Sequence, residues 1–304
     1  MRRRSTAALA ALSVLALAGC ASGPPPAEED AVDTGAPAPL ASDPTEEVVG
    51  EPSILELGRD DAAEIVDREI DLFTQGLEFG PDGSLYHSGG RYGQSRVIRT
   101  GVDGEVLAEY ELPDDEFAEG LTLVGEEVFL LTWRENIVRV LDADDLSEIR
   151  TLELGTEGWG ACYDDMQSLV WVADGSATVR GYAPDTFEEV TAFDVVDDTG
   201  DLLHRLNELE CIDGEVWANR WQLDEIVVVE PPVAAVPDDE GELPAVPIAL
   251  TIALPEISPD ADGRDAVLNG IAFDEENGMV WLTGKLWSEF FVFDYELLRG
   301  TPQP

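Results

Sequence analysis

The chain has 304 residues, of which 44% are hydrophobic, and its 65 acidic residues against 17 basic ones give a formal net charge of −48. Its length accommodates a targeting segment, a tail and one large domain, and its apolar content is enough for a sizeable core. Because nucleic acids and anionic membrane surfaces repel such a charge, we expect neither as a partner.

Residues 1–20 have the pattern of a secretory signal: a basic start, an apolar run from Ala7 to Ala18, and small residues before Cys20. The run is too short for a permanent transmembrane helix. Its ending, Leu17-Ala18-Gly19-Cys20, resembles the lipobox of bacterial lipoproteins. That resemblance implies a signal peptide over residues 1–19, lipidation of Cys20, and an exported protein anchored on the outer face of a bacterial cell membrane only through acyl chains. An ordinary signal peptide with an incidental cysteine is the alternative.

Residues 20–54 are rich in proline, alanine and acidic residues, and they contain no aromatic residue. Such a composition cannot bury enough apolar surface to fold. We therefore predict a disordered linker that holds a folded domain, residues 55–304, away from the membrane.

Within that domain a short motif recurs five times, with a polar or aromatic residue at its third position and a glycine at the fourth in all copies but one. The copies begin at Phe73, Phe117, Glu157, Leu206 and Val267, at spacings of 44, 40, 49 and 61 residues. Recurrence at such a period is typical of repeat architectures.

Each copy is followed by two or three short apolar runs separated by turn residues, a pattern that predicts β-strands. Five such units fit an all-β fold, a five-bladed β-propeller in which each motif starts an innermost strand. The strand near residues 63–70 has no blade of its own, and we predict that it completes the last blade and closes the ring. The proline-rich segment 231–249 is expected to be a surface loop inserted in the fourth blade.

Cys162 and Cys211 occupy the same position in two successive motifs, which places them on neighbouring inner strands. Export to an oxidising compartment makes a disulfide between them plausible. Two buried free thiols are the alternative.

The third motif positions would bring five side chains together at one end of the channel: Gln75, Glu119, Trp159, Glu208 and Asn269. A Glu119 carboxyl walled by Phe117, Trp133 and Trp159 would be desolvated, which raises a carboxyl pKa toward the range useful for proton transfer. Lys285, the only lysine in the propeller sequence, would complement the acidic side chains.

Metal chemistry has little support, because His87 and His204 do not share a metal-ligand spacing. Oxygen ligands for Ca²⁺ could come from Glu119, Asn207, Glu208 and Asn269, but Lys285 would oppose a cation there. We therefore predict no metal and no cofactor.

Nine short motifs in order, among them Phe73-Thr-Gln-Gly-Leu-Glu-Phe79, Phe117-Ala-Glu-Gly120, Leu206-Asn-Glu-Leu-Glu210 and Thr283-Gly-Lys285, resemble the plant and bacterial type of glutaminyl-peptide cyclotransferase. The resemblance covers about residues 60–295. It implies a five-bladed propeller and a metal-independent aminoacyltransferase that converts the N-terminal glutamine of peptides or proteins to pyroglutamate and releases ammonia.

The resemblance also implies roles. Glu119 matches the catalytic carboxylate, and Lys285, Gln75 and Asn207 match polar groups of the pocket. The aromatic wall that holds the glutamine side chain matches Phe73, Phe117, Trp133, Trp159 and Trp221. The chain departs from the family at Ala118, where glycine is usual, and near His87, which we expect at the rim.

Two other functions stay open at this point. One is a metal-dependent, lactonase-like hydrolase on the same propeller, and the other is a cell-surface propeller that binds peptides without turning them over. We expect a monomer in each case.

Overall fold

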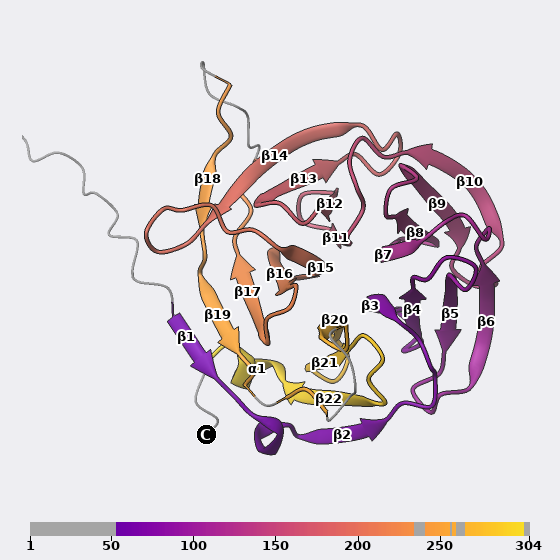
Figure 1. The fold of residues 1–304 in the computed structure, drawn as a ribbon, viewed down its shortest axis with the longest axis horizontal. Helices are drawn as coiled ribbons and strands as arrows, with labels where there is room; N and C mark the ends of the chain where they lie inside the picture. Colours follow the sequence, from indigo (N-terminus) through magenta and orange to yellow (C-terminus); the bar gives the residue numbers. More distant parts are fainter. Residues whose placement is uncertain (1–52, 234–240, 256, 260–264, 301–304) are drawn as a thin grey trace, which may run out of the picture. The chain divides into compact units, whose positions relative to one another are not determined.

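The computed structural model describes residues 53–233, 241–255, 257–259 and 265–300. The predicted signal peptide, the lipidation site at Cys20 and all but the last two residues of the predicted linker lie outside these ranges. In the described ranges no helix is long and apolar enough to cross a membrane. The strands form five sheets around a common axis (Figure 1), so the predicted five-bladed β-propeller is confirmed.

The first two blades are four-stranded and antiparallel. Blade one contains β3 (Thr74–Phe79), β4 (Leu85–Gly89), β5 (Arg96–Thr100) and β6 (Val106–Glu111). Blade two contains β7 (Ala118–Val124), β8 (Glu127–Thr132), β9 (Ile137–Asp142) and β10 (Glu148–Glu153). In both, the first three strands are largely buried between neighbouring blades, whereas the outer strand alternates between exposed and half-buried residues.

Blades three and four are the larger ones, each extended by a fifth strand that pairs in parallel. Blade three contains β11 (Gly160–Asp164), β12 (Leu169–Ala173), β13 (Thr178–Tyr182), β14 (Glu189–Val196) and β18 (Ala245–Pro247). Blade four contains β15 (Leu206–Ile212), β16 (Glu215–Arg220), β17 (Glu225–Val229), β19 (Leu250–Ala253) and β1 (Ser53–Glu56).

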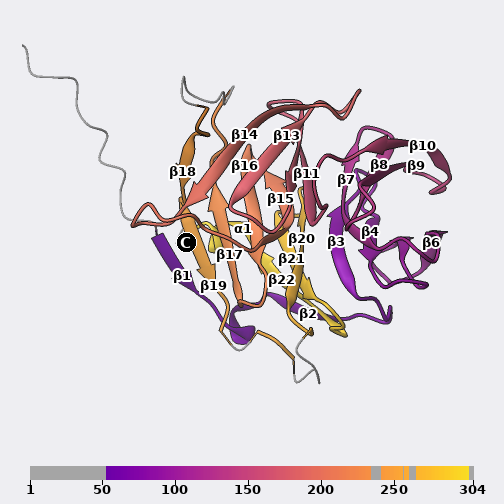
Figure 2. The ribbon, with the colours of Figure 1, turned by 45° about the horizontal axis from the view of Figure 1, so that its top comes forward.

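Both fifth strands differ from the sequence-based expectation. β18 lies inside segment 231–249, which we predicted to be a loop, and β1 begins two residues before the expected start of the domain. Figure 2 shows β1 beyond β19 at the edge of the fourth blade. Short strands such as these form because they pair with a neighbouring strand that is distant in the sequence. A local residue pattern does not reveal that pairing.

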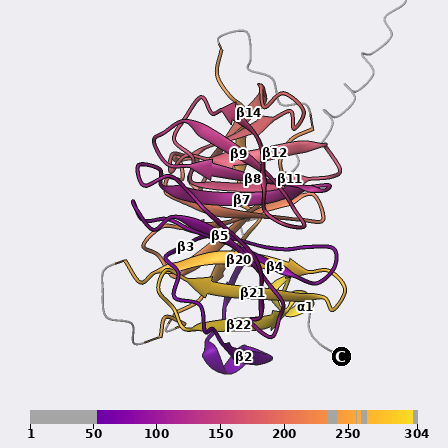
Figure 3. The same ribbon diagram turned by 90° about the vertical axis from the view of Figure 1, so that its right-hand side faces the viewer.

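The last blade consists of β20 (Leu268–Asp274), β21 (Met279–Gly284), β22 (Glu289–Asp294) and β2 (Glu64–Asp67). β2 pairs antiparallel with β22, so that Ile65 faces Phe291. Figure 3 shows this blade edge-on, with β2 at the rim. The prediction that an N-terminal strand completes the last blade is therefore confirmed. The described helices are single turns, η1 (Arg59–Asp61) and α1 (Tyr295–Leu298).

The recurring glycines let the inner strands approach one another around the axis. A Cβ added to Gly160 would lie 1.9 Å from the carbonyl oxygen of Asn207, and one added to Gly120 would lie 2.6 Å from the Cα atom of Gly160. Gly120 N donates to Trp159 O at 2.9 Å across the same contact. Any side chain at these positions would push two blades apart, so the glycines are a packing requirement.

The core is divided into five apolar clusters, each between two adjacent blades. Trp171 belongs to the cluster between blades three and four, and Trp217 and Trp287 belong to the one between blades four and five. These three tryptophans are therefore structural, which is the usual role of a large buried aromatic residue.

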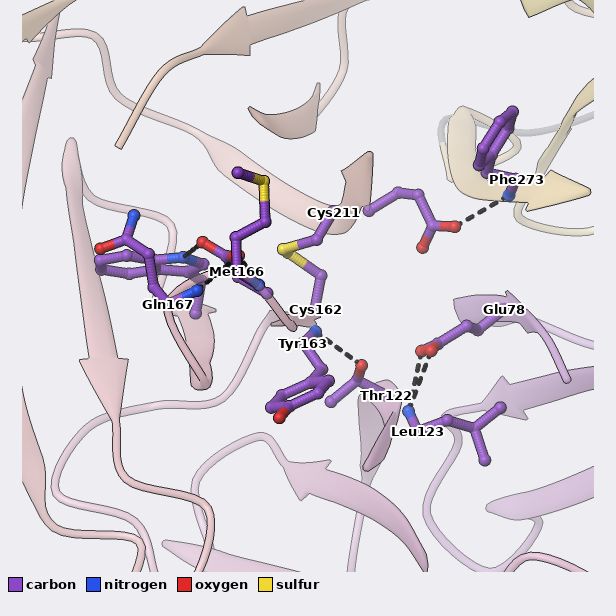
Figure 4. Close-up of a disulfide and its surroundings, with 12 residues drawn as sticks. Glu78, Thr122, Leu123, Cys162, Tyr163, Met166, Gln167, Cys211 and Phe273 are labelled. Atoms are coloured by element: carbon purple, nitrogen blue, oxygen red, sulfur yellow. Dashed lines mark hydrogen bonds between the residues drawn. A yellow bond between two sulfur atoms is a disulfide. The ribbon is translucent and has the colours of Figure 1, made fainter. Parts of the chain in front are cut away.

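One covalent bond also joins neighbouring blades. Cys162 on β11 and Cys211 on β15 form a disulfide whose Cα atoms are 5.3 Å apart (Figure 4). Between blades two and three the contact is a hydrogen bond instead, in which Tyr163 N donates to Thr122 Oγ1 at 2.8 Å. Of the two possibilities that the sequence left open for these cysteines, the structure contains the disulfide.

Candidate active site

The topology gathers side chains from all five blades at one end of the channel. The inner strands all run the same way, so their first residues meet there, and each antiparallel second strand ends beside them. In blade two, Trp133 follows β8 and its backbone N–H donates to Phe117 O at 3.0 Å, just before Glu119 on β7. Residues far apart in the sequence therefore share one site.

A cavity of about 210 Å³ lies at this end of the channel. Its lining includes nine of the eleven residues predicted to catalyse or bind substrate. The lining residues are Phe73, Gln75, Phe117, Glu119, Trp133, Trp159, Asn207, Trp221, Asp265 and Lys285.

The two predicted residues that do not line the cavity are Glu208 and Asn269. Glu208 is 1% exposed, and its carboxylate accepts hydrogen bonds from Leu77 N at 3.3 Å and Ile271 N at 2.9 Å. A shift in strand register between Leu206 and Leu209 accompanies this arrangement, with Asn207 rather than Glu208 at the cavity. We predicted Glu208 at the pocket because Leu209 was aligned with the motif glycines. The same kind of register shift occurs in β7 between Ala118 and Leu121 and in β20 between Leu268 and Ile271. Aligned by this shift, Asn207 and not Glu208 corresponds to Glu119.

Asn269 instead supports the cavity from outside its lining. Its Oδ1 accepts from Asn207 Nδ2 at 2.7 Å, and its Nδ2 donates to Thr74 O at 3.1 Å. Because both asparagines are buried, these hydrogen bonds fix the Asn207 amide in one orientation.

Glu119 is the buried acid of the cavity, with 6% of its surface exposed. Burial raises its pKa well above the usual value, repulsion from Glu135 and Glu157 raises it further, and attraction to Lys285 opposes the increase. Gln75 Nε2 donates to Glu119 Oε1 at 3.3 Å, while Gln75 Oε1 has no hydrogen-bond partner among the described residues. The arrangement gives a buried carboxyl group whose pKa is raised, which is the kind of group that general acid–base catalysis uses.

Among the described residues that line the cavity, Lys285 supplies the only positive charge. It is 6% exposed and its ammonium nitrogen lies 5.2 Å from the centre of the Phe73 ring. Burial lowers its pKa, whereas attraction to Glu119 and Asp265 raises it. Leu286, the next residue, has a φ of 64°, a left-handed conformation that costs a branched residue on the order of 1 kcal/mol and that fixes the chain where it turns toward blade one.

The walls are aromatic and are held by one carboxylate. Glu157 Oε2 accepts from Trp133 Nε1 at 3.0 Å and from Trp159 Nε1 at 3.3 Å. The Trp159 ring meets Trp221 edge to face at 5.7 Å, and Phe117 packs against Trp133 at 5.5 Å. Glu157 therefore orients the wall and also acts electrostatically on Glu119.

Sequence reasoning missed the functional positions of Asp265 and Glu157. Asp265 ends the polar loop before the fifth motif and lines the cavity, and Glu157 is the first residue of the third motif copy. In a chain with 65 acidic residues, an acidic residue in or beside a repeat motif does not by itself indicate a functional site.

The two departures from the family pattern have simple structural outcomes. Ala118 is fully buried and pairs with Thr132, and it is not among the described residues with positive φ, so its methyl group causes no backbone strain. His87 does not lie at the rim as expected: it is 1% exposed, and its Nε2 is 3.1 Å from Thr100 Oγ1.

Within the described ranges no group of three or more His, Cys, Asp or Glu side chains is placed to hold a metal ion.

Fold and site together define a five-bladed β-propeller with a buried carboxyl group of raised pKa in an aromatic pocket on its axis. The model of the family named glutamine cyclotransferase matches residues 60–295. The chain therefore belongs to the glutamine cyclotransferase family, as its motifs indicated.

Two known proteins show the extent of the similarity. The chain is 33% identical over 223 residues to a glutaminyl-peptide cyclotransferase of Arabidopsis thaliana, a match that covers 73% of this chain and 66% of that protein. The crystal structure of Myxococcus xanthus glutaminyl cyclase superposes with a TM-score of 0.68 at 27% identity, covering 80% of this chain and 97% of that one.

Proposed function

We propose that the protein is a glutaminyl-peptide cyclotransferase, an aminoacyltransferase that closes the N-terminal glutamine of a peptide into pyroglutamate. The observation that carries the proposal is Glu119, a buried carboxyl group of raised pKa in an aromatic cavity of about 210 Å³. The family membership and the activities named for the two relatives support it.

In the proposed reaction the α-amine of glutamine attacks its own side-chain carbonyl carbon. The new C–N bond closes the ring, the bond from that carbon to the amide nitrogen breaks, and ammonia leaves. Glu119 takes a proton from the attacking amine and delivers it to the departing nitrogen. A carboxyl group whose pKa is raised by burial is a better proton donor to the departing nitrogen than an ordinary glutamate.

Charge that develops on the carbonyl oxygen needs hydrogen-bond donors. The Lys285 ammonium forms no hydrogen bond among those of the described residues, and Asn207 Nδ2 has one proton left after its bond to Asn269. Both groups line the cavity with Glu119. We assign both groups as hydrogen-bond donors to the carbonyl oxygen in the transition state, because donors held in fixed positions stabilise developing charge most effectively.

The reaction is intramolecular, so much of the catalysis is orientation. The extended glutamine side chain must fold back onto its own amine, and holding that conformation removes an entropic part of the barrier. Trp133, Trp159 and Trp221 form walls that would confine the methylene groups in this shape. Gln75 Oε1, which is buried and has no partner among the residues that the structure describes, is available to accept a hydrogen bond from the α-amine.

We also infer that the enzyme is exported and held at the membrane by lipid on Cys20, and that it is a monomer. The signal-like start and the lipobox-like ending support the first inference. The Cys162–Cys211 disulfide is consistent with it, since such bonds persist in oxidising compartments. Cys20→Ala in the full chain should release the protein from the membrane fraction, and retention there would contradict a lipid anchor.

The activity is tested by ammonia release from a dipeptide that begins with glutamine. The same dipeptide with an acetylated N-terminus is the control, because its nitrogen can no longer attack, and we expect no ammonia from it. Ammonia from both peptides would indicate a hydrolytic amidase instead. Loss of turnover in EDTA would favour the metal-dependent hydrolase, and binding without turnover would favour the peptide-binding propeller.

A further inference from the structure

A second, smaller cavity lies where the first and last blades meet. Its volume is about 40 Å³, and its lining shares no residue with the cavity around Glu119. Arg68 and Phe290 line it from the last blade, and His87 and Thr100 line it from blade one. This is the joint at which β2 closes the ring.

Arg68 presents unused hydrogen-bond donors at this joint. Its side chain is buried, with 6% of the residue exposed, and Nη1 donates to Thr74 Oγ1 at 2.7 Å. Nε and Nη2 are both buried without a hydrogen-bond partner among the described residues. A buried donor that is left unsatisfied costs about 1–3 kcal/mol, and more when the group is charged.

The charge of Arg68 also lacks a counter-ion. None of the ion pairs in the described part of the chain includes it. Asp67, Glu69 and Asp103 line the cavity but are exposed, and none of them pairs with Arg68. Asp71 acts on Arg68 only from beyond ion-pair distance. The Phe290 ring, 5.4 Å away, compensates only part of a buried charge.

His87 adds a further donor to the same lining. It is 1% exposed, its Nε2 lies 3.1 Å from Thr100 Oγ1, and its Nδ1 has no hydrogen-bond partner in the described part of the chain. Burial and the nearby Arg68 lower its pKa well below the usual value, so the ring is neutral. In the tautomer with Nδ1 protonated, Nε2 accepts from the Thr100 hydroxyl and Nδ1–H becomes available to an acceptor.

We propose that this cavity binds one small inorganic anion of the chloride class, held by Arg68 Nε and Nη2 and by His87 Nδ1. A cavity of this size and polarity could also hold water, but water would leave the buried guanidinium charge without a counter-ion. The Arg68 backbone is already attached to the last blade, because Arg68 N donates to Ser288 O at 2.7 Å. An anion held by both Arg68 and His87 would connect this segment to blade one as well. The site is independent of the proposed catalytic function.

The test compares thermal unfolding in sodium chloride with thermal unfolding in sodium gluconate at equal ionic strength. The gluconate anion is too large for the cavity. Ligands that bind only the folded state stabilise it, so we expect the Tm to rise with chloride, by about 5 °C or more at roughly one hundred times the Kd. A Tm that is equal in the two salts would overturn the proposal.

Two arginine variants separate anion binding from packing. Arg68→Met keeps most of the stem and removes the charge, so we expect it to lose the chloride effect and to be no less stable than the parent in gluconate. A purely structural arginine would instead give the same loss in both salts. Arg59→Met is the matched control, because Arg59 also lies over a phenylalanine of the last blade, Phe291 at 4.7 Å, but is paired with Glu289.

Crystals of the parent protein soaked in sodium bromide give a direct readout that does not depend on how the variants fold. We expect an anomalous peak within hydrogen-bond distance of Arg68 Nε and Nη2. A cavity that contains only water in those crystals would contradict the proposal.

Discussion

At the scale of single residues, the site is organised by charges that act on Glu119 in opposite directions. Burial and the carboxylates of Glu135 and Glu157 raise its pKa, and Lys285 lowers it. A general base must be deprotonated to act, so the proposed activity should appear as the pH rises through this pKa. The acid limb of kcat/KM therefore reports the electrostatics of the cavity.

Glu157→Gln should move that acid limb to lower pH, because it removes a negative charge that raises the pKa of Glu119. The glutamine side-chain oxygen can still accept from Trp133 and Trp159, so the wall should keep its shape. Lys285→Met should move the limb in the opposite direction, with a lower rate because a donor to the oxyanion is lost. The pH profile of kcat/KM checks both, and a limb that shifts the same way in both variants would contradict this account.

At the scale of elements, the inner strands show what a sequence can reveal about this fold and what it cannot. The spacing of the motif copies predicts five blades, and in three of them the motif glycine meets the backbone of the next inner strand: Gly76, Gly120 and Gly160. Apolar alternation predicts the second strands, and the unassigned strand at 63–70 predicts the ring closure. These features depend on local chemistry that every blade repeats.

Asn207 rather than Glu208 reaches the cavity because of a register shift that β7 and β20 share with β15, and the sequence does not show where that shift falls in the fourth copy. Side chains alternate along a strand, so one bulge decides which of two neighbours reaches the cavity, and that depends on the strand opposite. Asp265 and Glu157 were missed for a related reason, since their roles come from folding and not from the motif itself. The aromatic wall was predictable only through the family resemblance.

The disulfide between β11 and β15 should stabilise the contact between blades three and four. It links residues 49 positions apart, and loop-closure entropy then predicts roughly 2–4 kcal/mol. We expect a reductant to lower the Tm of the parent by about 5–10 °C. The double variant Cys162→Ala with Cys211→Ala should start from the lower Tm and not respond to reductant. An unchanged Tm in the reduced parent would show that the bond contributes nothing.

Three carboxyl groups that face the channel should make the propeller less stable in alkali. Burial raises the pKa of Glu78 to about 8, and burial and repulsion from Glu78 raise the pKa of both Glu208 and Glu210 well above 4.5. A folded-state pKa above the unfolded value gives stability that is complete below the unfolded pKa and is lost as pH rises through the folded one.

Glu210→Gln tests this directly, because glutamine can still accept the hydrogen bond from Phe273 N at 2.8 Å but cannot ionise. We expect the variant to gain Tm relative to the parent at pH 9 and to gain least at pH 5. Glu105→Gln, at an exposed turn position, is the control. Parallel Tm profiles for Glu210→Gln and the parent would refute the assignment.

At the scale of the whole molecule, the net charge of −48 should bias the encounter with substrates. A strongly negative protein attracts cationic ligands and repels anionic ones over a range that salt shortens, from a Debye length of about 30 Å at 0.01 M to about 3 Å at 1 M.

Under the proposed activity, kcat/KM should be higher for a Gln-Lys dipeptide than for Gln-Glu at low salt. The preference should shrink as sodium gluconate is added to about 0.5 M, because screening removes the long-range part of the attraction. Gln-Gln serves as the uncharged reference. A preference that persists unchanged at high salt would indicate a specific contact in the pocket and not the field of the molecule.

The central claim is that Glu119 transfers the proton during cyclisation, and one comparison tests it most directly. Ammonia release from a Gln-initiated dipeptide would be measured for the parent and for Glu119→Gln, which keeps the size of the side chain and its contact with Gln75. We predict a fall in kcat of about 10²–10⁴-fold, the usual contribution of a positioned general acid–base group, with the Tm of the variant equal to or above that of the parent. A folded Glu119→Gln protein that cyclises at the parent rate would contradict the account.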